Sequence, residues 1–535
     1  MGPRRWVRSR SRYRPRRPAR GRGALCDDVA VPDWTYHPLS PALVAVLGRG
    51  RAHRAALHAL ATLSSTRAGR GVVRFLSHHP PVPDDLRGRF GAVVPVEHAA
   101  DAVRALPALG AGVVEVGPVA AADADAVRRA AEGRTCTLVV RAADAAAARA
   151  CAPFADRVVV GPVPGHVHLD DPAPGAALDA LADPGSTVLA TPALLVRSGP
   201  GWFQRVVEAS TPTGSPAPLR SVGRDPRRWP AWLWGLLVGL GMVGAGLGAA
   251  LITLGPLLLW YDRAYLGMDR TQLGDLNDRL VPFLQHDRIT MAGTMVAIGV
   301  LYAGLAWGGM RAGWPWARTA LAVSGMLSFP TLLYFLVIGF VEPLHTAVTV
   351  VLFPMFLLAV LGRPAAPAWS LRPDVDEGVR RRSLVGQLLM VATGLGMLAG
   401  GVVISLVGLS DVFVPSDLVF LGVHADELRE ASERVVPFVA HDRAGFGGAL
   451  VGAALAVLLL SAWGWRAGER WVWWTLALSA AAGFLPAVVV HLLIGYTDVL
   501  HLAPVLVGVV LTAVALVLAR PYLCAATARV AARTR

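Results

Sequence analysis

A histidine–aspartate–arginine triplet occurs twice in the apolar part of the chain, each time at the end of the same eight-residue motif. Residues 281–288 read VPFLQHDR and residues 436–443 read VPFVAHDR, so His441 follows His286 by 155 positions (441 − 286). Imidazoles and carboxylates bind divalent metals or haem iron and exchange protons. Because the same chemistry recurs at one fixed offset, the two triplets are the first candidates for a functional site.

Two further histidines each follow an acid by three residues, His345 after Glu342 and His501 after Asp498. Positions i and i+3 share one face of a helix, which is the spacing of carboxylate-bridged metal sites in helix bundles. We predict one shared site for a divalent metal or haem at the outer face of the membrane. Its predicted ligands are His286, His345, His441, His501, Glu342 and Asp498, with Asp287, Asp442, Arg288 and Arg443 around them to orient the rings.

A structural alternative stays open for the same residues. Asp287 and Asp442 could cap helices, Arg288 and Arg443 could reach lipid head groups, and each histidine could hydrogen-bond a neighbour. Ionisable groups within or beside membrane spans are costly, however, and tend to mark function. The two interpretations differ in whether the protein binds metal or haem.

The elements that must position these residues are membrane spans of ~20 apolar residues each. The 155-residue offset aligns further pairs outside the motif, so we expect two parallel four-helix repeats, at residues 231–363 and 384–520, joined by a basic linker at 364–383. Each long outer loop should hold one short amphipathic helix that ends at the proline of the motif. The eight expected spans cover about residues 232–257, 289–310, 317–340, 345–362, 384–409, 445–464, 471–494 and 500–519.

Arginine sets the expected orientation, because the sequence contains no lysine and its net charge of +14 is an arginine surplus. Loops rich in arginine alternate with loops rich in acids, which predicts a bacterial-type plasma-membrane protein with both termini in the cytoplasm. Residues 1–37 read as a disordered basic tail that contacts anionic lipid rather than nucleic acid, and residues 521–535 as a cytoplasmic tail. Four cysteines without CxxC spacing argue against a zinc ribbon or a disulfide framework.

Residues 38–211 predict a soluble α/β domain, followed by a linker at 212–230. Two helical patterns come first, between residues 38 and 76, and short β-branched runs then alternate with Ala-rich helical segments. That alternation is typical of a parallel sheet. The five expected strands lie at residues 92–96, 112–116, 137–140, 158–160 and 187–190.

The α/β domain resembles the class 2, membrane-associated dihydroorotate dehydrogenases over roughly residues 38–210. Residues 51–60 (RAHRAALHAL) are similar to that family's helical entry motif, and residues 91–119 to its first strand, helix and second strand, with the Glu-Val-Gly signature at 115–117. Residues 198–203 (SGPGWF) are similar to the segment before its last helix. The resemblance implies a TIM-barrel-like fold, FMN and quinone-linked oxidation of dihydroorotate.

The chain departs from that family where the flavin is held. Residues 95–99 (PVEHA) replace the family's flavin-gripping Gly-Phe-Asp-Lys-Asn run, and Pro118 replaces a threonine. The family's lysines and its Asn-rich loop with the serine base have no counterpart here. A complete (β/α)₈ barrel typically needs ~200 residues or more. We therefore expect a shortened barrel of about five strands that does not bind FMN and has lost catalysis.

Three functions remain open at this point. One is a non-enzymatic membrane protein whose outer histidine/carboxylate cluster has a sensing, redox or scaffold role. Another is a quinone-linked dihydroorotate dehydrogenase carrying FMN, the activity that the resemblance implies. The last is a metal- or haem-binding redox or transport unit of the membrane. The absorbance spectrum of the purified protein separates them, because FMN and haem have distinct bands.

Overall fold

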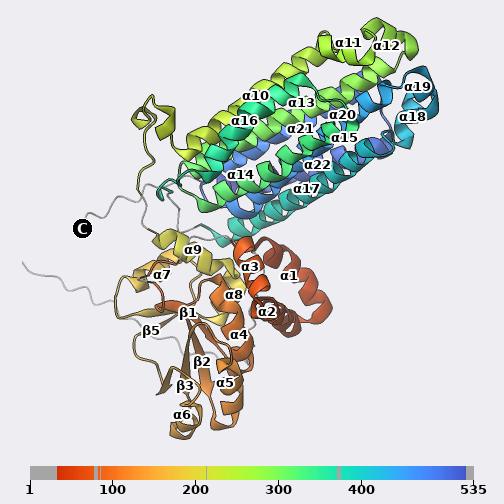
Figure 1. The fold of residues 1–535 in the computed structure, drawn as a ribbon. Coiled ribbons are helices and arrows are strands. Elements are labelled where there is room, and N and C mark those ends of the chain that lie inside the picture. Colours follow the sequence, from red (N-terminus) through yellow and green to blue (C-terminus); the bar gives the residue numbers. More distant parts are fainter. Residues whose placement is uncertain (1–32, 78–81, 85, 212–213, 370–374, 526–535) are drawn as a thin grey trace, which may run out of the picture.

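The computed structural model describes residues 33–77, 82–84, 86–211, 214–369 and 375–525, which form an α/β domain and a helical bundle (Figure 1). Most of the expected basic tail and the end of the C-terminal tail lie outside these residues. Residues 33–37 of that expected tail are helical, because α1 (Asp33–Leu47) begins at Asp33. Two more helices, α2 (Arg49–Ser65) and α3 (Arg67–Ser77), precede the sheet, so the two expected helical patterns are three helices.

The sheet of the α/β domain is a parallel half-barrel of six described strands, one more than expected. The strand order is β4-β3-β2-β1-β6-β5, and every neighbouring pair is parallel. The additional strand is β5, whose sequence HVHL places polar residues on one face instead of a β-branched run. The strands are β1 (Phe90–Val94), β2 (Val113–Val119), β3 (Thr137–Ala142), β4 (Arg157–Val160), β5 (His166–Leu169) and β6 (Thr187–Ala190).

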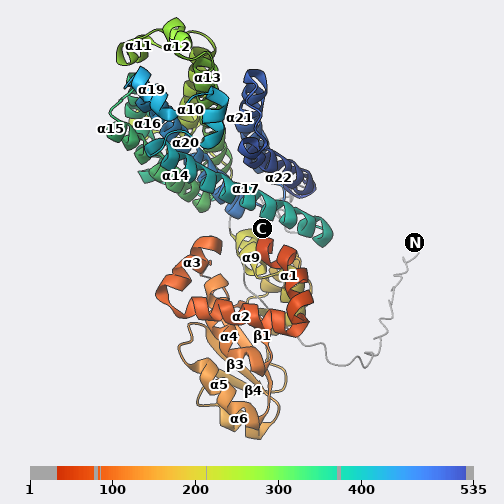
Figure 2. The same ribbon diagram turned by 90° about the vertical axis from the view of Figure 1, so that its right-hand side faces the viewer.

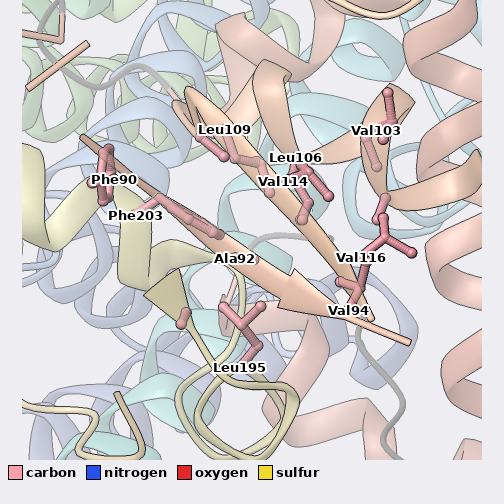
Figure 3. Packing of buried hydrophobic residues seen from close by; sticks show 14 of the residues in the cluster. Phe90, Ala92, Val94, Val103, Leu106, Leu109, Val114, Val116, Leu195 and Phe203 are labelled. Carbon is pink, nitrogen blue, oxygen red and sulfur yellow. The ribbon is translucent and has the colours of Figure 1, made fainter. Parts of the chain in front are cut away.

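Helices cover one face of this sheet and form the main core with it. Phe90, Ala92 and Val94 of β1 alternate toward that face, as the period of two along a strand requires, and Phe203 packs against Phe90 (Figure 3). The helices that follow the strands are α4 (Ala99–Ala105), α5 (Ala124–Ala131), α6 (Ala145–Cys151), α7 (Pro174–Leu181), α8 (Pro192–Ser198) and α9 (Gly201–Ser210).

The opposite face of the sheet holds a smaller apolar cluster and one buried acid, Glu115. Its carboxylate accepts from Arg141 Nε at 3.0 Å and contacts His166 Nδ1 at 2.7 Å and His168 Nε2 at 3.1 Å. Burial raises the pKa of Glu115, but the hydrogen bonds with His166, His168 and Arg141 outweigh burial and lower it to about 2. Every oxygen of this carboxylate is therefore occupied by a neighbour on β3 or β5.

The bundle contains, within the described residues, eight helices long and apolar enough to cross a membrane, as the sequence predicts. The chain thus has the form of a multi-pass membrane protein. Two of these helices continue past an irregular turn, α13 through a π-helical stretch to Met310 and α14 into α15 (Tyr334–Ile338). The eight begin with α10 (Ala231–Leu254), α13 (Leu280–Gly304), α14 (Pro315–Ser328), α16 (Pro343–Leu361), α17 (Glu377–Leu409), α20 (Val435–Gly464), α21 (Arg470–Ile494) and α22 (Val499–Leu523).

Each long loop of the bundle holds two short helices rather than the one expected. They are α11 (Trp260–Leu266), α12 (Arg270–Leu276), α18 (Pro415–Leu421) and α19 (Ala425–Ala431). The motif prolines do not end a helix, because α13 and α20 already begin two residues before Pro282 and Pro437. Proline is tolerated there since the first turn of a helix has no intrahelical use for its N–H groups.

Two helices, α13 and α20, form the centre of the bundle and are the most buried of the eight. Each packs against the first helix of its own half of the chain, α10 or α17. Each also packs against the third helix of the other half, α13 on α21 and α20 on α14. This crosswise packing decides which histidines meet.

The α/β domain lies against one end of the bundle, and α11, α12, α18 and α19 lie at the opposite end (Figures 1 and 2). We call that opposite end the distal end. The α/β domain contacts the bundle through the packing of α1 on α17 and through buried ion pairs. Among them, Arg466 pairs with Glu208 and Arg380 with Asp33.

Candidate functional site

Two separate groups of potential metal ligands lie near the distal end of the bundle. The three-histidine cluster consists of His286, His491 and His501, and the histidine–glutamate cluster of Glu342, His345 and His441. Within each group the ligand atoms lie within 4.8 Å of one another. Each group combines residues from both halves of the chain.

In the three-histidine cluster, neighbouring oxygens hold the Nδ1 side of each ring. His286 Nδ1 contacts the Phe283 carbonyl, and His491 Nδ1 lies 2.7 Å from the Ala487 carbonyl. His501 Nδ1 lies 3.2 Å from the Tyr496 hydroxyl, which itself donates to Asp417 and so accepts from the ring. A carbonyl can only accept, so Nδ1 carries the proton and Nε2 keeps its lone pair.

The Nε2 atoms of His491 and His501 are 3.2 Å apart. With both Nδ1 atoms protonated and both rings neutral, this is a contact between two acceptors, which a metal ion or a shared proton between them would stabilise. Nitrogens bound ~2.1 Å from a tetrahedral metal lie ~3.4 Å from each other. The separation therefore fits two ligands of one metal ion, with His286 as the third.

The histidine–glutamate cluster also places its potential ligand atoms close together, but one of its three potential ligands is a carboxylate. His441 Nδ1 lies 3.1 Å from Asp442, while its Nε2 is buried without a hydrogen-bond partner among the described residues. His345 contacts Glu342, whose other oxygen accepts from the Tyr261 hydroxyl at 2.6 Å. Two histidines and one glutamate form a known donor set for zinc with an open position.

The expected single site is therefore wrong, and five of its six predicted ligands are divided between two clusters. A shared site required the second and fourth spans of each half to adjoin. Instead α13 and α20 each face helices of the other half, so His286 meets His501 and His441 meets His345. The sixth residue, Asp498, accepts from the backbone N–H of His501 at 2.7 Å and caps α22.

The aspartates and arginines of the motif form crosswise ion pairs at the centre of the bundle. Arg288 Nε donates to Asp442 at 2.7 Å, and Arg443 Nε donates to Asp287 at 3.3 Å. Asp287 and Asp442 lie inside α13 and α20, beyond the first turn, so they cap neither helix, and the buried arginines do not reach lipid head groups. Asp442 Oδ1 also lies 3.1 Å from His441 Nδ1, whereas Asp287 Oδ1 lies 3.5 Å from His286 Nε2.

Two further buried acids, Asp262 and Asp417, occur at the same offset (417 − 262 = 155). Arg443 Nη1 donates to Asp417 at 2.5 Å, while Arg288 Nη1 lies 3.6 Å from Asp262. Sequence reasoning counted both acids only as loop charges, although the offset itself marks them. The residue 155 positions before His491, residue 336, is a leucine, so the repeated pattern does not mark His491, yet it completes the three-histidine cluster.

Asp262 and Asp417 differ in the pKa of their carboxyl groups. Burial raises the pKa of Asp262 from 3.8 to about 6, and the charge of Arg288 only partly opposes this. Burial also acts on Asp417, but the charge and hydrogen bond of Arg443 outweigh it and lower the pKa. The hydroxyl of Tyr496 donates to Asp417 as well, at 2.7 Å.

Replacing Asp262 with asparagine is expected to stabilise the protein near neutral pH. Between pH 3.8 and about 6 the folded chain binds more protons at Asp262 than the unfolded chain, so stability falls as pH rises through this window. A shift of about 2 units corresponds to about 3 kcal/mol at most. Thermal unfolding in detergent should show a higher Tm for Asp262→Asn at neutral pH and no gain below pH 3.8.

The matched variant Asp417→Asn should have the opposite effect and lower the Tm. The pKa of Asp417 in the folded chain is below its unfolded value of 3.8, so the charged carboxylate stabilises the fold at pH values above 3.8. Equal shifts in Tm for the two variants would contradict the assigned difference between the acids.

Comparison of the chain with protein-family models, with curated proteins and with solved structures finds no match. The resemblance of the α/β domain to class 2 dihydroorotate dehydrogenases therefore stays a prediction.

Proposed function

We propose that this multi-pass membrane protein binds two divalent transition-metal ions, one in the three-histidine cluster and one in the histidine–glutamate cluster. The observation that carries the proposal is the 3.2 Å contact between His491 Nε2 and His501 Nε2. The buried and unpartnered His441 Nε2 supports the second site. Neutral imidazoles held through Nδ1 by oxygens are the usual form of metal-binding histidines.

We further propose that the α/β domain is a shortened (β/α)₈ barrel without catalytic activity, docked on the cytoplasmic end of the bundle. The strand order β4-β3-β2-β1-β6-β5 supports it, because chain order around a barrel would give this order with an opening between β4 and β5. No lysine is available to hold a flavin or a substrate. The domain then acts as a sensing or scaffold element for the metal-binding bundle.

Metal content of the detergent-purified protein tests the proposal. Wild-type protein is expected to hold two equivalents of zinc or a similar metal after equilibration and desalting. His491→Ala and His441→Ala should each lose one equivalent, and the double variant both. His424→Ala is the matched control, because His424 is exposed on the distal end and belongs to neither cluster.

The opposite results are equally clear. Wild-type protein without metal would mean that His491 and His501 share a proton instead, and the proposal would be wrong. A haem band in the absorbance spectrum would show that the protein holds iron porphyrin and not a divalent metal ion. Stoichiometric FMN, or rescue of a pyrimidine auxotroph, would restore dihydroorotate dehydrogenase activity as the function.

A further inference from the structure

A large cavity of 530 Å³ extends from the three-histidine cluster into the bundle, between α13, α17, α20, α21 and α22. His286, His491 and His501 line its distal end. The remaining walls are mainly apolar, including Leu476 and Met390 at the other end. Along α21, His491 and Leu476 are 15 residues apart, which is ~22 Å at ~1.5 Å per residue. The cavity thus runs through most of the ~30 Å hydrocarbon core of a bilayer.

A second cavity, of only 90 Å³, lies at corresponding positions beside His345. Most of its lining residues have a counterpart in the larger cavity 155 residues later, or 156 residues later in the fourth helix of each half, where His345 corresponds to His501. The difference in volume follows from side-chain size, because large residues of the small cavity correspond to small residues of the large one. The pairs are Ile298 and Ala453, Tyr302 and Val457, Leu332 and Ala487, and Leu352 and Gly508.

The large cavity opens sideways toward the hydrocarbon. Val403 on α17 and Val507 on α22 both line it, and each side chain is more than half exposed on the bundle surface. An apolar cavity with such an opening is accessible to hydrocarbon chains of the surrounding lipid. Its occupant is therefore expected to enter from the membrane and not from water.

Among the described residues, no carboxylate belongs to the cluster of three histidines at the polar end of the cavity, although Asp287 lies 3.5 Å from His286 Nε2. In the histidine–glutamate cluster Glu342 supplies a carboxylate, but the corresponding residue near the three-histidine cluster, Asp498, caps α22 instead. The nearby acids Asp287 and Asp417 are both engaged by Arg443. A dication held by three neutral imidazoles therefore keeps an open position that favours an anionic oxygen.

We propose that the large cavity binds a single-chain membrane lipid whose anionic oxygen head, a carboxylate or phosphate, completes the coordination of the metal in the three-histidine cluster. The hydrocarbon chain lies along α17 and α21. This inference rests on the proposed function, since the metal holds the head group. The small cavity, filled by Tyr302 and Leu352, takes no such ligand, so one half of the bundle binds lipid and the other does not.

Binding of radiolabelled palmitate, palmitoyl lysophosphatidic acid and hexadecanol to the purified full chain tests the inference. Gly396 on α17 lines the large cavity, and a Cβ built on it meets nothing within 4 Å, so Gly396→Phe adds a bulky side chain to the cavity wall from an open position. Gly244→Phe on α10 is the matched control, because its Cβ also meets nothing within 4 Å and it lines neither described cavity. Metal content is measured on the same samples.

Palmitate or the lysophosphatidic acid is expected to bind at one equivalent, and the tighter of the two identifies the head group. Hexadecanol should bind the wild-type protein about tenfold more weakly or worse, because it has no anionic head group. Gly396→Phe and His491→Ala should each bind the acidic lipid about tenfold more weakly or worse, and Gly396→Phe should keep both metal equivalents. Equal binding by Gly396→Phe and Gly244→Phe, or equal affinity for hexadecanol, would overturn the inference. Wild-type protein that holds metal but binds no lipid would also overturn the lipid inference and leave the proposed function intact. Wild-type protein that binds lipid but holds no metal would contradict the proposed function and the coordination of the head group.

Discussion

Replacing Arg443 with methionine is expected to reduce folding stability by about 3–5 kcal/mol. The guanidinium is buried and lies 3.3 Å from Asp287 and 2.5 Å from Asp417. Removing it leaves the Asp287 and Asp417 carboxylates without this cation in a low-dielectric environment, although Tyr496 still donates to Asp417. The cost should appear as a lower denaturant midpoint for the detergent-solubilised variant, monitored by the fluorescence of tryptophans in the bundle.

A surface ion pair provides the control for this experiment. Arg429 lies 2.6 Å from Asp426 on α19, but both side chains are exposed. Exposed pairs contribute ~0–1 kcal/mol, so Arg429→Met should change the midpoint little. An Arg443→Met variant that is as stable as Arg429→Met would show that the crosswise pairs do not hold the bundle together.

The motif arginines Arg288 and Arg443 also act on the two histidine clusters, each through an aspartate of the second half of the chain. Arg288 of the first half fixes Asp442, which orients His441. Arg443 of the second half fixes Asp417, whose partner Tyr496 orients His501. Each arginine therefore supports the cluster to which the histidine of its own triplet does not belong, since Arg288 acts on His441 and Arg443 acts on His501. Loss of one pair should disturb metal binding as well as stability.

The sequence predicts the spans well, because a length of apolar residues is a local property. It also predicts the residue types of the site, since His286 and His441 stand out by their offset. What it could not predict was which helices are neighbours. Whether His286 meets His345 or His501 depends on the packing of α13 against α21, and that packing is set by side chains spread over both halves.

The additional strand β5 and the additional ligand His491 were not predicted from the sequence, for a related reason. The β5 strand carries His166 and His168, which face Glu115 on another strand, so its polar residues are satisfied only in the folded sheet. His491 likewise has no counterpart in the first half and acquires its role from His501, ten residues later (501 − 491). A pattern within one segment cannot reveal partners of this kind.

Replacing Glu208 with alanine is expected to weaken the docking of the α/β domain on the bundle by about 3–5 kcal/mol. Glu208 on α9 is buried, and Arg466 Nε donates to it at 2.8 Å. The guanidinium of Arg466 also lies 4.6 Å from the ring centre of Trp314. Without Glu208 this buried cation loses its hydrogen-bonded carboxylate, and the aromatic contact is insufficient to offset its lost hydration.

A specific-protease site introduced at residues 214–217 allows this docking to be measured. After cleavage the wild-type α/β domain should stay with the bundle in size-exclusion chromatography, because Arg380 and Arg466 still pair with Asp33 and Glu208. The cleaved Glu208→Ala variant should separate into two peaks. Glu132→Ala is the control, since Glu132 pairs with Arg128 on the exposed surface of the same domain. If cleaved Glu208→Ala elutes as one complex like this control, the interface depends on apolar packing such as Phe75 on Trp463 and not on the buried ion pair.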